Sequence, residues 1–166
     1  DFNQDNRFDI VTINNGVDNI ALFLGYGNGI FEEPTMYSTG SYSSISVAIG
    51  DLNKDHRLDI VVIDDDTGSI DILLGQYEGI LNQTEYSTGS YPISVAVGDF
   101  NNDIRLDIIV VNYASNDVSV LLGYGNGSFA EETRYSVGFS PISVAVSDFN
   151  SDTRLDIIVV NYASND

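Results

Sequence analysis

Short apolar stretches recur along the chain between segments rich in glycine and aspartate. Each stretch holds four to six residues, many of them Val or Ile, which is too short for a helix and typical of a β-strand. Four stretches fall within each repeat, and the third is the most polar, around Tyr37, Tyr86 and Tyr135. This third stretch is predicted to be an outer edge strand. The spacing of apolar residues that is typical of a helix does not occur.

The other stretches are dominated by aliphatic side chains. The first stretches span residues 10–13, 60–63, 108–111 and 157–160, the second span 20–24, 70–74 and 118–122, and the fourth span 45–50, 93–98 and 142–147. Several are apolar on both faces, which predicts sheets covered on both sides by neighbouring sheets. We therefore predict an all-β fold of tandem four-stranded antiparallel blades, as in a β-propeller or a propeller-like repeat array.

The whole chain, residues 1–166, is predicted to be a single repeat array. Its units are about 1–50, 51–98 and 99–147, followed by a partial unit, 148–166. Propellers have roughly four to eight blades. We therefore expect the chain to be part of a longer repetitive protein, or to be completed by copies of itself through strand addition.

Glycine-rich pentapeptides follow the second stretches. Two of them read Gly-Tyr-Gly-Asn-Gly, at residues 25–29 and 123–127, and the segment at 75–79 is looser. Asn-Gly between apolar runs predicts a tight hairpin with a type I′ turn, in which both central residues take positive φ. These segments are not expected to bind phosphate, because they contain no Lys and no helix is predicted after them.

A nine-residue motif, D-x-N-x-D-x-R-x-D, precedes each first stretch. Its four copies are separated by 50, 48 and 49 residues, which indicates a repeat architecture. Oxygens at positions 1, 3, 5 and 9 allow a short loop to bring hard ligands to one ion, and calcium takes about six to eight such ligands. Position 7 would add its backbone carbonyl and point its side chain outward. The predicted ligands of about one Ca²⁺ per loop, up to four in all, are Asp1, Asn3, Asp5, Arg7 (backbone O) and Asp9; Asp51, Asn53, Asp55, Arg57 (backbone O) and Asp59; Asp99, Asn101, Asp103, Arg105 (backbone O) and Asp107; and Asp148, Asn150, Asp152, Arg154 (backbone O) and Asp156.

Other ions and other loop types fit the motif less well. Magnesium demands a near-ideal octahedron, and zinc prefers Cys and His ligands. An EF-hand is excluded, because its acid at position 12 is replaced by Thr12 or by valine. The alternative without a metal is an Asp/Asn-rich turn whose side chains bind their own backbone. Three carboxylates in each loop favour a cation, because without one they repel each other.

The negative charge of the chain is concentrated in this motif. It contains twelve of the 25 acidic residues, whereas the whole chain has 6 basic residues and a formal net charge of −19. We expect no binding to nucleic acid or to anionic membranes, which requires clustered Lys and Arg. The chain lacks Cys, so disulfides cannot stabilise it, and no apolar run is long enough for membrane insertion.

The motif, together with the segments SVAVGDFN and LLGYGNGSF, resembles FG-GAP or VCBS-type repeats, the calcium-loop repeats of integrin-α-like propellers, along essentially the whole chain. The resemblance implies four-stranded blades, calcium in a hairpin loop between two strands of a blade, and roles in adhesion, recognition or scaffolding without catalysis. Position 6 departs from the family, which usually has Gly or Asn there, where the backbone must be permissive. Because Ile104 is β-branched, we expect the third loop to be distorted or to bind calcium weakly.

These features predict a non-enzymatic, calcium-stabilised, extracellular or cell-surface protein that serves as a structural or adhesive scaffold and assembles into a ring or filament. Its partners would be copies of itself or further repeats of the same chain. The alternative is a ligand-recognition propeller, integrin-α-like or lectin-like, with a protein or carbohydrate ligand. No catalytic site is predicted, because the sequence offers no set of nucleophile, base and orienting group. Two sequons, at Asn82 and Asn126, are candidate N-glycosylation sites.

Overall fold

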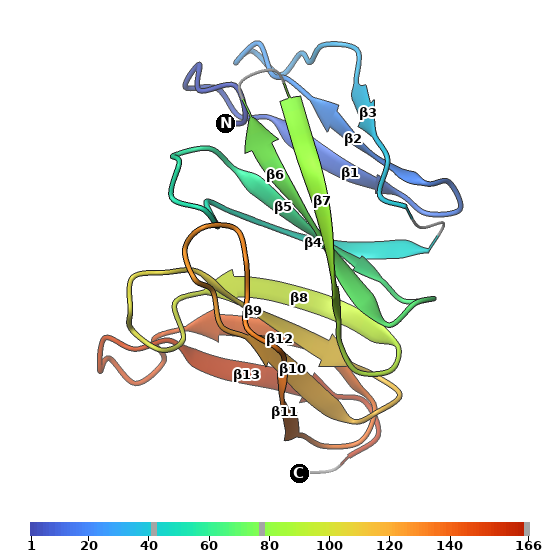
Figure 1. Cartoon of the computed structure of the whole chain (residues 1–166), viewed down its shortest axis with the longest axis vertical. Coiled ribbons are helices and arrows are strands. Elements are labelled where there is room, and N and C mark those ends of the chain that lie inside the picture. Colours follow the sequence, from blue (N-terminus) through green and yellow to red (C-terminus); the bar gives the residue numbers. More distant parts are fainter. Residues whose placement is uncertain (41–42, 77–78, 165–166) are drawn as a thin grey trace.

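The computed structural model describes residues 1–40, 43–76 and 79–164, without the side chains of residues 79–82. All of the regular secondary structure in this part of the chain is β-strand (Figure 1), so it contains no helix that could cross a membrane. The strands are β1 (Ile10–Asn14), β2 (Asn19–Phe23), β3 (Thr35–Tyr37), β4 (Ser44–Gly50), β5 (Asp59–Asp64), β6 (Ser69–Gln76), β7 (Gly79–Ser87), β8 (Pro92–Gly98), β9 (Asp107–Asn112), β10 (Asp117–Leu121), β11 (Thr133–Ser136), β12 (Pro141–Ser147) and β13 (Asp156–Asn161).

Four antiparallel sheets follow one another along the chain. The two four-stranded sheets are β4-β5-β6-β7 and β8-β9-β10-β11, while β1-β2-β3 and β12-β13 form smaller sheets. Strands that are adjacent in sequence are also adjacent in each sheet, so every sheet is a meander. The prediction of an all-β fold with four-stranded antiparallel blades is confirmed. The polar third stretches are the edge strands β3, β7 and β11, as predicted.

Each sheet is offset from the sequence units. The last stretch of one unit, for example β4, pairs with the first stretch of the next unit, β5, and the pairs β8-β9 and β12-β13 repeat this arrangement. A register shift recurs near the start of β4, β8 and β12. The aspartate loops, residues 1–8, 51–58, 99–106 and 148–155, each precede the second strand of such a pair. Three of the four therefore connect two strands of one sheet.

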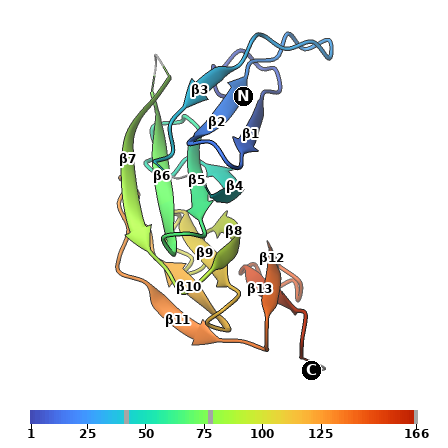
Figure 2. The same cartoon turned by 90° about the vertical axis from the view of Figure 1, so that its right-hand side faces the viewer.

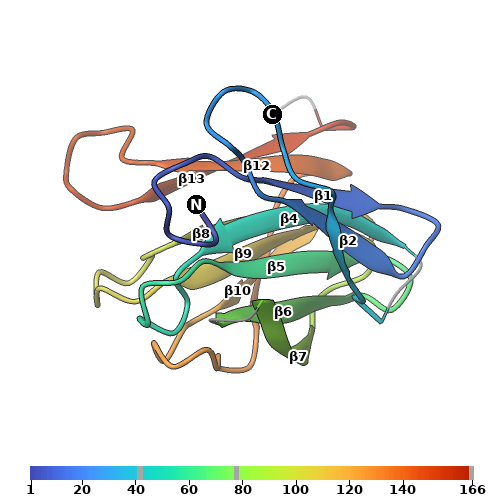
Figure 3. The ribbon, with the colours of Figure 1, turned by 90° about the horizontal axis from the view of Figure 1, so that it is seen from above.

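The sheets stack face to face along a curved row (Figure 2). The first strands of successive sheets, β4, β8 and β12, contact one another on the inner side of the curve, and the edge strands lie on the outer side. Figure 3, viewed from the end with the N-terminal sheet, shows that most strands lie along roughly the same axis, with neighbouring strands antiparallel. The row is open, because the β1-β2-β3 and β12-β13 sheets lie at its opposite ends (Figures 1 and 2).

The hydrophobic core lies between the sheets. Strand β5 is buried on both faces: Ile60 and Val62 pack toward the β1-β2-β3 sheet, whereas Val61 and Ile63 pack toward the β8-β9-β10-β11 sheet. Burying each side chain of this size contributes about 1.5–3 kcal/mol. Because these contacts form only between neighbours, each sheet depends on the next for its stability.

The glycine turns reverse the chain by a different geometry from the one predicted. Positive φ occurs at Gly27 and Gly29, and again at Gly125 and Gly127, but not at the asparagine between each pair. The prediction of a type I′ turn centred on Asn-Gly is therefore wrong for these two segments. A longer loop forms instead, closed by a hydrogen bond from the Tyr26 N–H to the Ile30 carbonyl at 2.9 Å and by its counterpart at Tyr124. The looser segment at 75–79 includes residues 77 and 78, which lie outside the described residues.

A carboxyl group, Asp71, is buried between the first two sheets. It lies in β6 opposite Glu85 of β7, on the face toward the β1-β2-β3 sheet, and only 4% of it is exposed. Burial raises the pKa of Asp71 to about 6; the charges of Glu85, Asp64 and Asp18 act in the same direction, and a hydrogen bond from Gln83 opposes them. The negative charge of Asp71 therefore opposes folding at neutral pH.

We expect the substitution Asp71→Asn to raise the free energy of unfolding at pH 7 by up to about 3 kcal/mol, because each unit of pKa shift corresponds to about 1.4 kcal/mol. In the wild-type chain the folded-state pKa of Asp71 lies above the ordinary value of 3.8 for an aspartate, so this group adds stability as pH falls through about 6 and toward 4. The variant should lack that gain. Urea denaturation at several pH values measures both effects. The control is Asp66→Asn, which removes an exposed carboxylate nearby; equal pH slopes for the wild type and Asp71→Asn would contradict the assignment.

Candidate metal centres

The aspartate loops share one backbone conformation. In each loop positions 4 and 6 have positive φ, between 61° and 71°. Alternation of this kind turns successive N–H groups toward the loop interior, where side-chain oxygens accept them. The residues concerned are Gln4, Asn6, Lys54, His56, Asn102, Ile104, Ser151 and Thr153.

The side chains at positions 1, 3 and 5 bind the loop's own backbone. In the second loop the Asp51 carboxylate accepts the N–H groups of Asp55 at 3.1 Å and His56 at 2.9 Å. The Asn53 amide oxygen accepts the Asp55 N–H at 3.0 Å, and Asp55 accepts the Arg57 N–H at 2.8 Å. The same bonds recur in the other three loops at 2.7–3.2 Å. Every loop is thus capped by its own side chains. This is the arrangement that the sequence analysis gave as the alternative to a metal site.

The aspartate at position 9 connects the loop to the rest of its sheet. Asp59 is fully buried, and its two oxygens accept the N–H groups of Leu52 and Gly75, each at 2.8 Å. Asp107 binds Phe100 and Gly123 in the same way. Burial raises the pKa of both carboxyl groups, although these hydrogen bonds act in the opposite direction. Position 9 therefore holds together the start of a loop, the start of a strand and a glycine sixteen residues further along the chain.

A close backbone contact explains why the residue sixteen positions after this aspartate is glycine. A Cβ atom on Gly75 would lie 2.4 Å from the carbonyl oxygen of Leu58, and one on Gly123 would lie 2.1 Å from that of Leu106. Any side chain there would force the two backbone segments apart. The regular interval between the position-9 aspartate and this glycine was the sequence signal for the contact.

The residues that form these repeated loops and meander sheets also match a known protein family. The FG-GAP-like repeat profile matches residues 1–62, 57–110 and 99–159, which together cover most of the chain. The chain belongs to the FG-GAP-like repeat family. The predicted resemblance to FG-GAP repeats is thereby confirmed.

Other comparisons define the fold alone. No curated protein matches the chain. Among solved structures, the chain is similar to part of the Tc holotoxin pore of Photorhabdus luminescens, with a TM-score of 0.53 and 15% sequence identity. The similarity covers 94% of this chain but only 8% of the toxin chain. The FG-GAP array therefore spans a small part of that relative, and at this identity the likeness concerns architecture.

The third FG-GAP loop is not distorted, contrary to the prediction from its β-branched residue. Ile104 has φ of 69°, close to the 62° of Asn6 at the same position, and its N–H binds Asp99 at 2.7 Å. The loop thus retains its hydrogen bonds although Ile104 is strained, with 83% of the residue exposed. The prediction of weak calcium binding at this loop stays a prediction.

The substitution Ile104→Asn should relieve this strain and raise the free energy of unfolding by about 1 kcal/mol, because asparagine tolerates positive φ and a β-branched residue does not. Urea denaturation in excess chelator measures the change without a contribution from bound metal. Ile104→Val, which keeps the branched Cβ, is the matched control and should leave stability almost unchanged. A gain of equal size in both variants would show that the exposed apolar surface, and not the backbone, is responsible.

In the first and third loops the arginine side chain at position 7 folds back toward an aspartate of its own loop, whereas it was predicted to point outward. Arg7 Nη1 lies 3.6 Å from Asp5 Oδ2, and Arg105 Nη1 lies 3.8 Å from Asp103 Oδ2. The stem of Arg7 packs beside Gly27 in the glycine turn. These contacts offset part of the negative charge in the first and third loops.

The donor set of the loops fits calcium by its chemistry. Each loop supplies carboxylate oxygens at positions 1 and 5 and an amide oxygen at position 3, all hard ligands. Each oxygen that accepts an N–H retains a further lone pair. Within the described part of the chain, however, no three His, Cys, Asp or Glu side chains form a group that could hold a metal ion. The family and donor chemistry therefore support calcium, while the hydrogen bonds show loops closed by their own backbone.

The structure describes the side chain of only one of the two sequon asparagines. Asn126 is exposed in the turn between β10 and β11, and the Ser128 hydroxyl donates to its side-chain oxygen at 2.6 Å. The equivalent turn of the first repeat has Asn28 but carries Ile30 in place of the serine. The backbone of Asn82 lies in β7, whereas its side chain lies outside the described residues.

Proposed function

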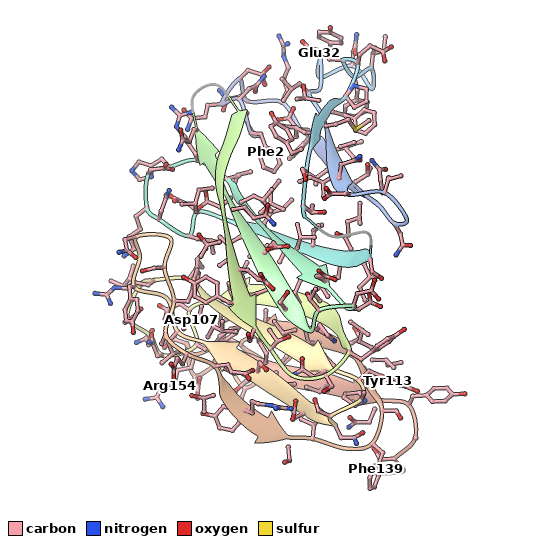
Figure 4. All side chains as sticks on the ribbon, turned by 45° about the vertical axis from the view of Figure 1, so that its right-hand side comes forward. Phe2, Glu32, Asp107, Tyr113, Phe139 and Arg154 are labelled. Carbon is pink, nitrogen blue, oxygen red and sulfur yellow. The ribbon has the colours of Figure 1, made fainter. Side chains whose placement is uncertain are left out.

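We propose that this FG-GAP array is a calcium-stabilised structural or adhesive scaffold outside the cell or at its surface. The observation that carries the proposal is the concentration of charge in the four nine-residue motifs, where twelve acidic residues stand against five basic ones. All four loops lie along one edge of the stack, at the left of Figure 1; Figure 4 labels Arg154 there. Removing a cation from such an edge leaves carboxylates close together with only part of their charge compensated.

Positions 1, 3, 5 and 9 of each loop, with the carbonyl of position 7, would hold one calcium ion, up to four in the chain. Bound calcium would supply positive charge that offsets the carboxylates at positions 1 and 5. The aspartate at position 9 would then bind the ion in addition to the backbone N–H groups from which it already accepts hydrogen bonds. Calcium modules of weak affinity suit the millimolar calcium found outside cells, which supports an extracellular location. A glycan on Asn126 would fit the same location, and loss of mass on glycosidase treatment of secreted protein tests it.

A scaffold that assembles through its end sheets is the form we favour. In β13, Ile158 and Val160 are about half exposed, whereas their counterparts in β9, Ile109 and Val111, are fully buried against the next sheet. Covering this face would bury further apolar surface. The proposed occupant is another repeat, from the same chain or from a second copy, which would extend the row into a ring or filament.

We expect sedimentation velocity of the chain in calcium to show species larger than a monomer, with rings or fibres in negative-stain images. The substitution Val160→Asp places a charge on the exposed face and should shift the distribution to monomer. Tyr124→Asp, at an exposed turn away from this face, is the control and should leave assembly unchanged. A monomeric wild-type chain at all concentrations would contradict self-assembly, although not assembly through further repeats.

We propose no catalytic role. The single histidine, His56, has a 93% exposed side chain in an aspartate loop, which suits neither a general base nor a nucleophile's partner. The second candidate is a ligand-recognition domain, and the observation that favours it is a polar cleft, lined by residues 65–68 and 88–91, on the edge opposite the aspartate loops.

A further inference from the structure

Three asparagines of the chain are followed directly by glycine, in the pairs Asn15-Gly16, Asn28-Gly29 and Asn126-Gly127. The last two pairs occupy the same place in identical Gly-Tyr-Gly-Asn-Gly turns, one between β2 and β3 and the other between β10 and β11. The side chain of such an asparagine can react with the backbone nitrogen that follows it, because glycine has no side chain to obstruct the approach. The two turns therefore place the same chemical groups in two different surroundings.

Both turns hold the asparagine side chain over the backbone that follows it. The Asn28 Oδ1 atom accepts the Ile30 N–H at 3.1 Å, and Asn126 Oδ1 accepts the Ser128 N–H at 3.0 Å. Such a bond closes a small ring that includes the intervening glycine nitrogen, so the side-chain carbon Cγ lies close to that nitrogen. The N–H donor also stabilises negative charge that develops on Oδ1 when Cγ is attacked. The reacting atoms are thus brought together before any reaction occurs.

The glycine nitrogen in the turn between β10 and β11 is protected by the neighbouring sheet. Gly127 is buried, and its N–H donates to the Leu52 carbonyl at 3.4 Å. A Cβ atom on Gly127 would lie 2.8 Å from Leu74 Cδ1, so the side chain of Leu74 covers this glycine. Before the nitrogen could attack, the hydrogen bond would have to break and hydroxide would have to reach the N–H.

The equivalent glycine between β2 and β3 is open to solvent. Gly29 is exposed, and a Cβ atom placed on it would meet no atom within 4 Å. Its N–H donates no hydrogen bond to any part of the chain that the structure describes. The connection from β2 to β3 projects at the N-terminal end of the row (Figure 2), where water and hydroxide reach it. Asn28 therefore combines a poised side-chain amide with an accessible backbone nitrogen.

The third pair, in the turn between β1 and β2, lacks this arrangement. The N–H of Val17 donates to the Asn14 carbonyl at 3.2 Å, so it does not hold the Asn15 side chain over Gly16. Asn15 Nδ2 instead donates to the Ser44 carbonyl at 3.3 Å, which ties the side chain to another sheet. We expect Asn15 to react more slowly than Asn28.

We propose that Asn28 is a site of spontaneous deamidation in the folded chain and that Asn126 is protected from this reaction. Hydroxide removes the Gly29 N–H proton, and the nitrogen then attacks Asn28 Cγ. The new N–Cγ bond closes a five-membered succinimide ring, while the Cγ–Nδ2 bond breaks and Nδ2 takes a proton from water and leaves as ammonia. Water then adds to one of the two ring carbonyls and opens the ring, which gives aspartate or isoaspartate.

This modification changes the turn in two ways. Each event adds one negative charge to a chain whose formal net charge is already −19. Isoaspartate also adds one CH₂ group to the backbone between Tyr26 and Ile30, whose N–H and carbonyl close the turn at 2.9 Å. The first glycine turn therefore becomes longer and more acidic as the protein ages. The reaction is covalent and requires no bound calcium.

Peptide mapping by mass spectrometry, after incubation of the chain in mildly alkaline buffer, tests the proposal. The protein is made in bacteria, so that no glycan protects Asn126. In the folded chain we expect Asn28 to lose ammonia at least about tenfold faster than Asn126, which is the scale of one hydrogen bond that must first break. In urea the two rates should become equal, because both asparagines lie in the same pentapeptide. Equal rates in the folded chain, or a difference that persists in urea, would overturn the proposal.

Two variants separate the reaction from its protection. Asn28→Gln should abolish the fast loss of ammonia, because a longer side chain cannot close a five-membered ring, and should leave Asn126 unchanged. Leu74→Ala uncovers Gly127 and should accelerate deamidation of Asn126 while Asn28 keeps its rate. Far-UV circular dichroism establishes that each variant is folded. A fast phase that persists in Asn28→Gln, or an unchanged rate at Asn126 in Leu74→Ala, would contradict the assignment.

Discussion

The substitution Asp59→Ala is expected to lower the free energy of unfolding by about 4 kcal/mol, because it leaves two buried N–H groups without an acceptor at about 1–3 kcal/mol each. Those groups belong to Leu52 and Gly75, which are buried with Asp59 in the described chain. The loop and the end of β6 would lose their common attachment. We expect cooperative unfolding at markedly lower urea concentration, measured by far-UV circular dichroism.

The control for this experiment is the same substitution in the fourth loop. Asp156 accepts the Phe149 N–H at 3.0 Å and a long contact from Asn150 at 3.5 Å, and it is only partly buried. Asp156→Ala should therefore cost about 1 kcal/mol. Both variants are measured in excess chelator, so that a lost ion cannot explain the difference. Equal costs in the two variants would contradict a structural role that depends on burial.

Removal of calcium is the second change from which we expect a large effect. An ion present at about 100 times its dissociation constant adds about 2.7 kcal/mol of stability per site when it binds only the folded state. Excess chelator should therefore lower the thermal unfolding midpoint, and the loss should grow with the number of occupied loops. The FG-GAP loops without the ion retain their hydrogen bonds, so we expect a less stable fold and not a disordered chain.

A single-loop variant makes this prediction specific. Asp55→Asn removes one carboxylate from the second loop while leaving an oxygen for the Arg57 N–H, which Asp55 accepts at 2.8 Å. The variant should lose about one loop's share of the calcium-dependent gain and little stability in chelator. The matched control, Asp66→Asn, removes an exposed carboxylate away from the loops. A calcium response that is identical in all three proteins would place the ion outside the second loop.

Local patterns were sufficient to predict the strands. Runs of β-branched residues gave β1, β5, β9 and β13 at nearly their observed bounds, because such runs on a buried sheet leave few alternatives. The polar third stretches also gave the correct edge strands. The sequence did not show which strands pair between units. β4 ends the first unit in sequence, but it forms its hydrogen bonds with β5 of the second unit.

Contacts between distant residues account for what the sequence could not show. The spacing of the motif predicted Asp59 as a metal ligand, yet its two hydrogen bonds join residues seven before and sixteen after it. Asp71 lies within an apolar stretch, and nothing local indicates that it is buried beside Glu85. Likewise, the strained φ of Ile104 is maintained by the Asp99 carboxylate five residues earlier. In each case a specific hydrogen bond or burial outweighs local propensity.

The central claim is that the aspartate loops of this FG-GAP array bind calcium. Isothermal titration of the chelator-treated, dialysed chain with calcium chloride tests it directly. Our account predicts saturable binding that approaches four ions per chain, with one ion fewer in Asp55→Asn. The absence of saturable binding at millimolar calcium would contradict the claim and would leave the loops as turns closed by their own side chains.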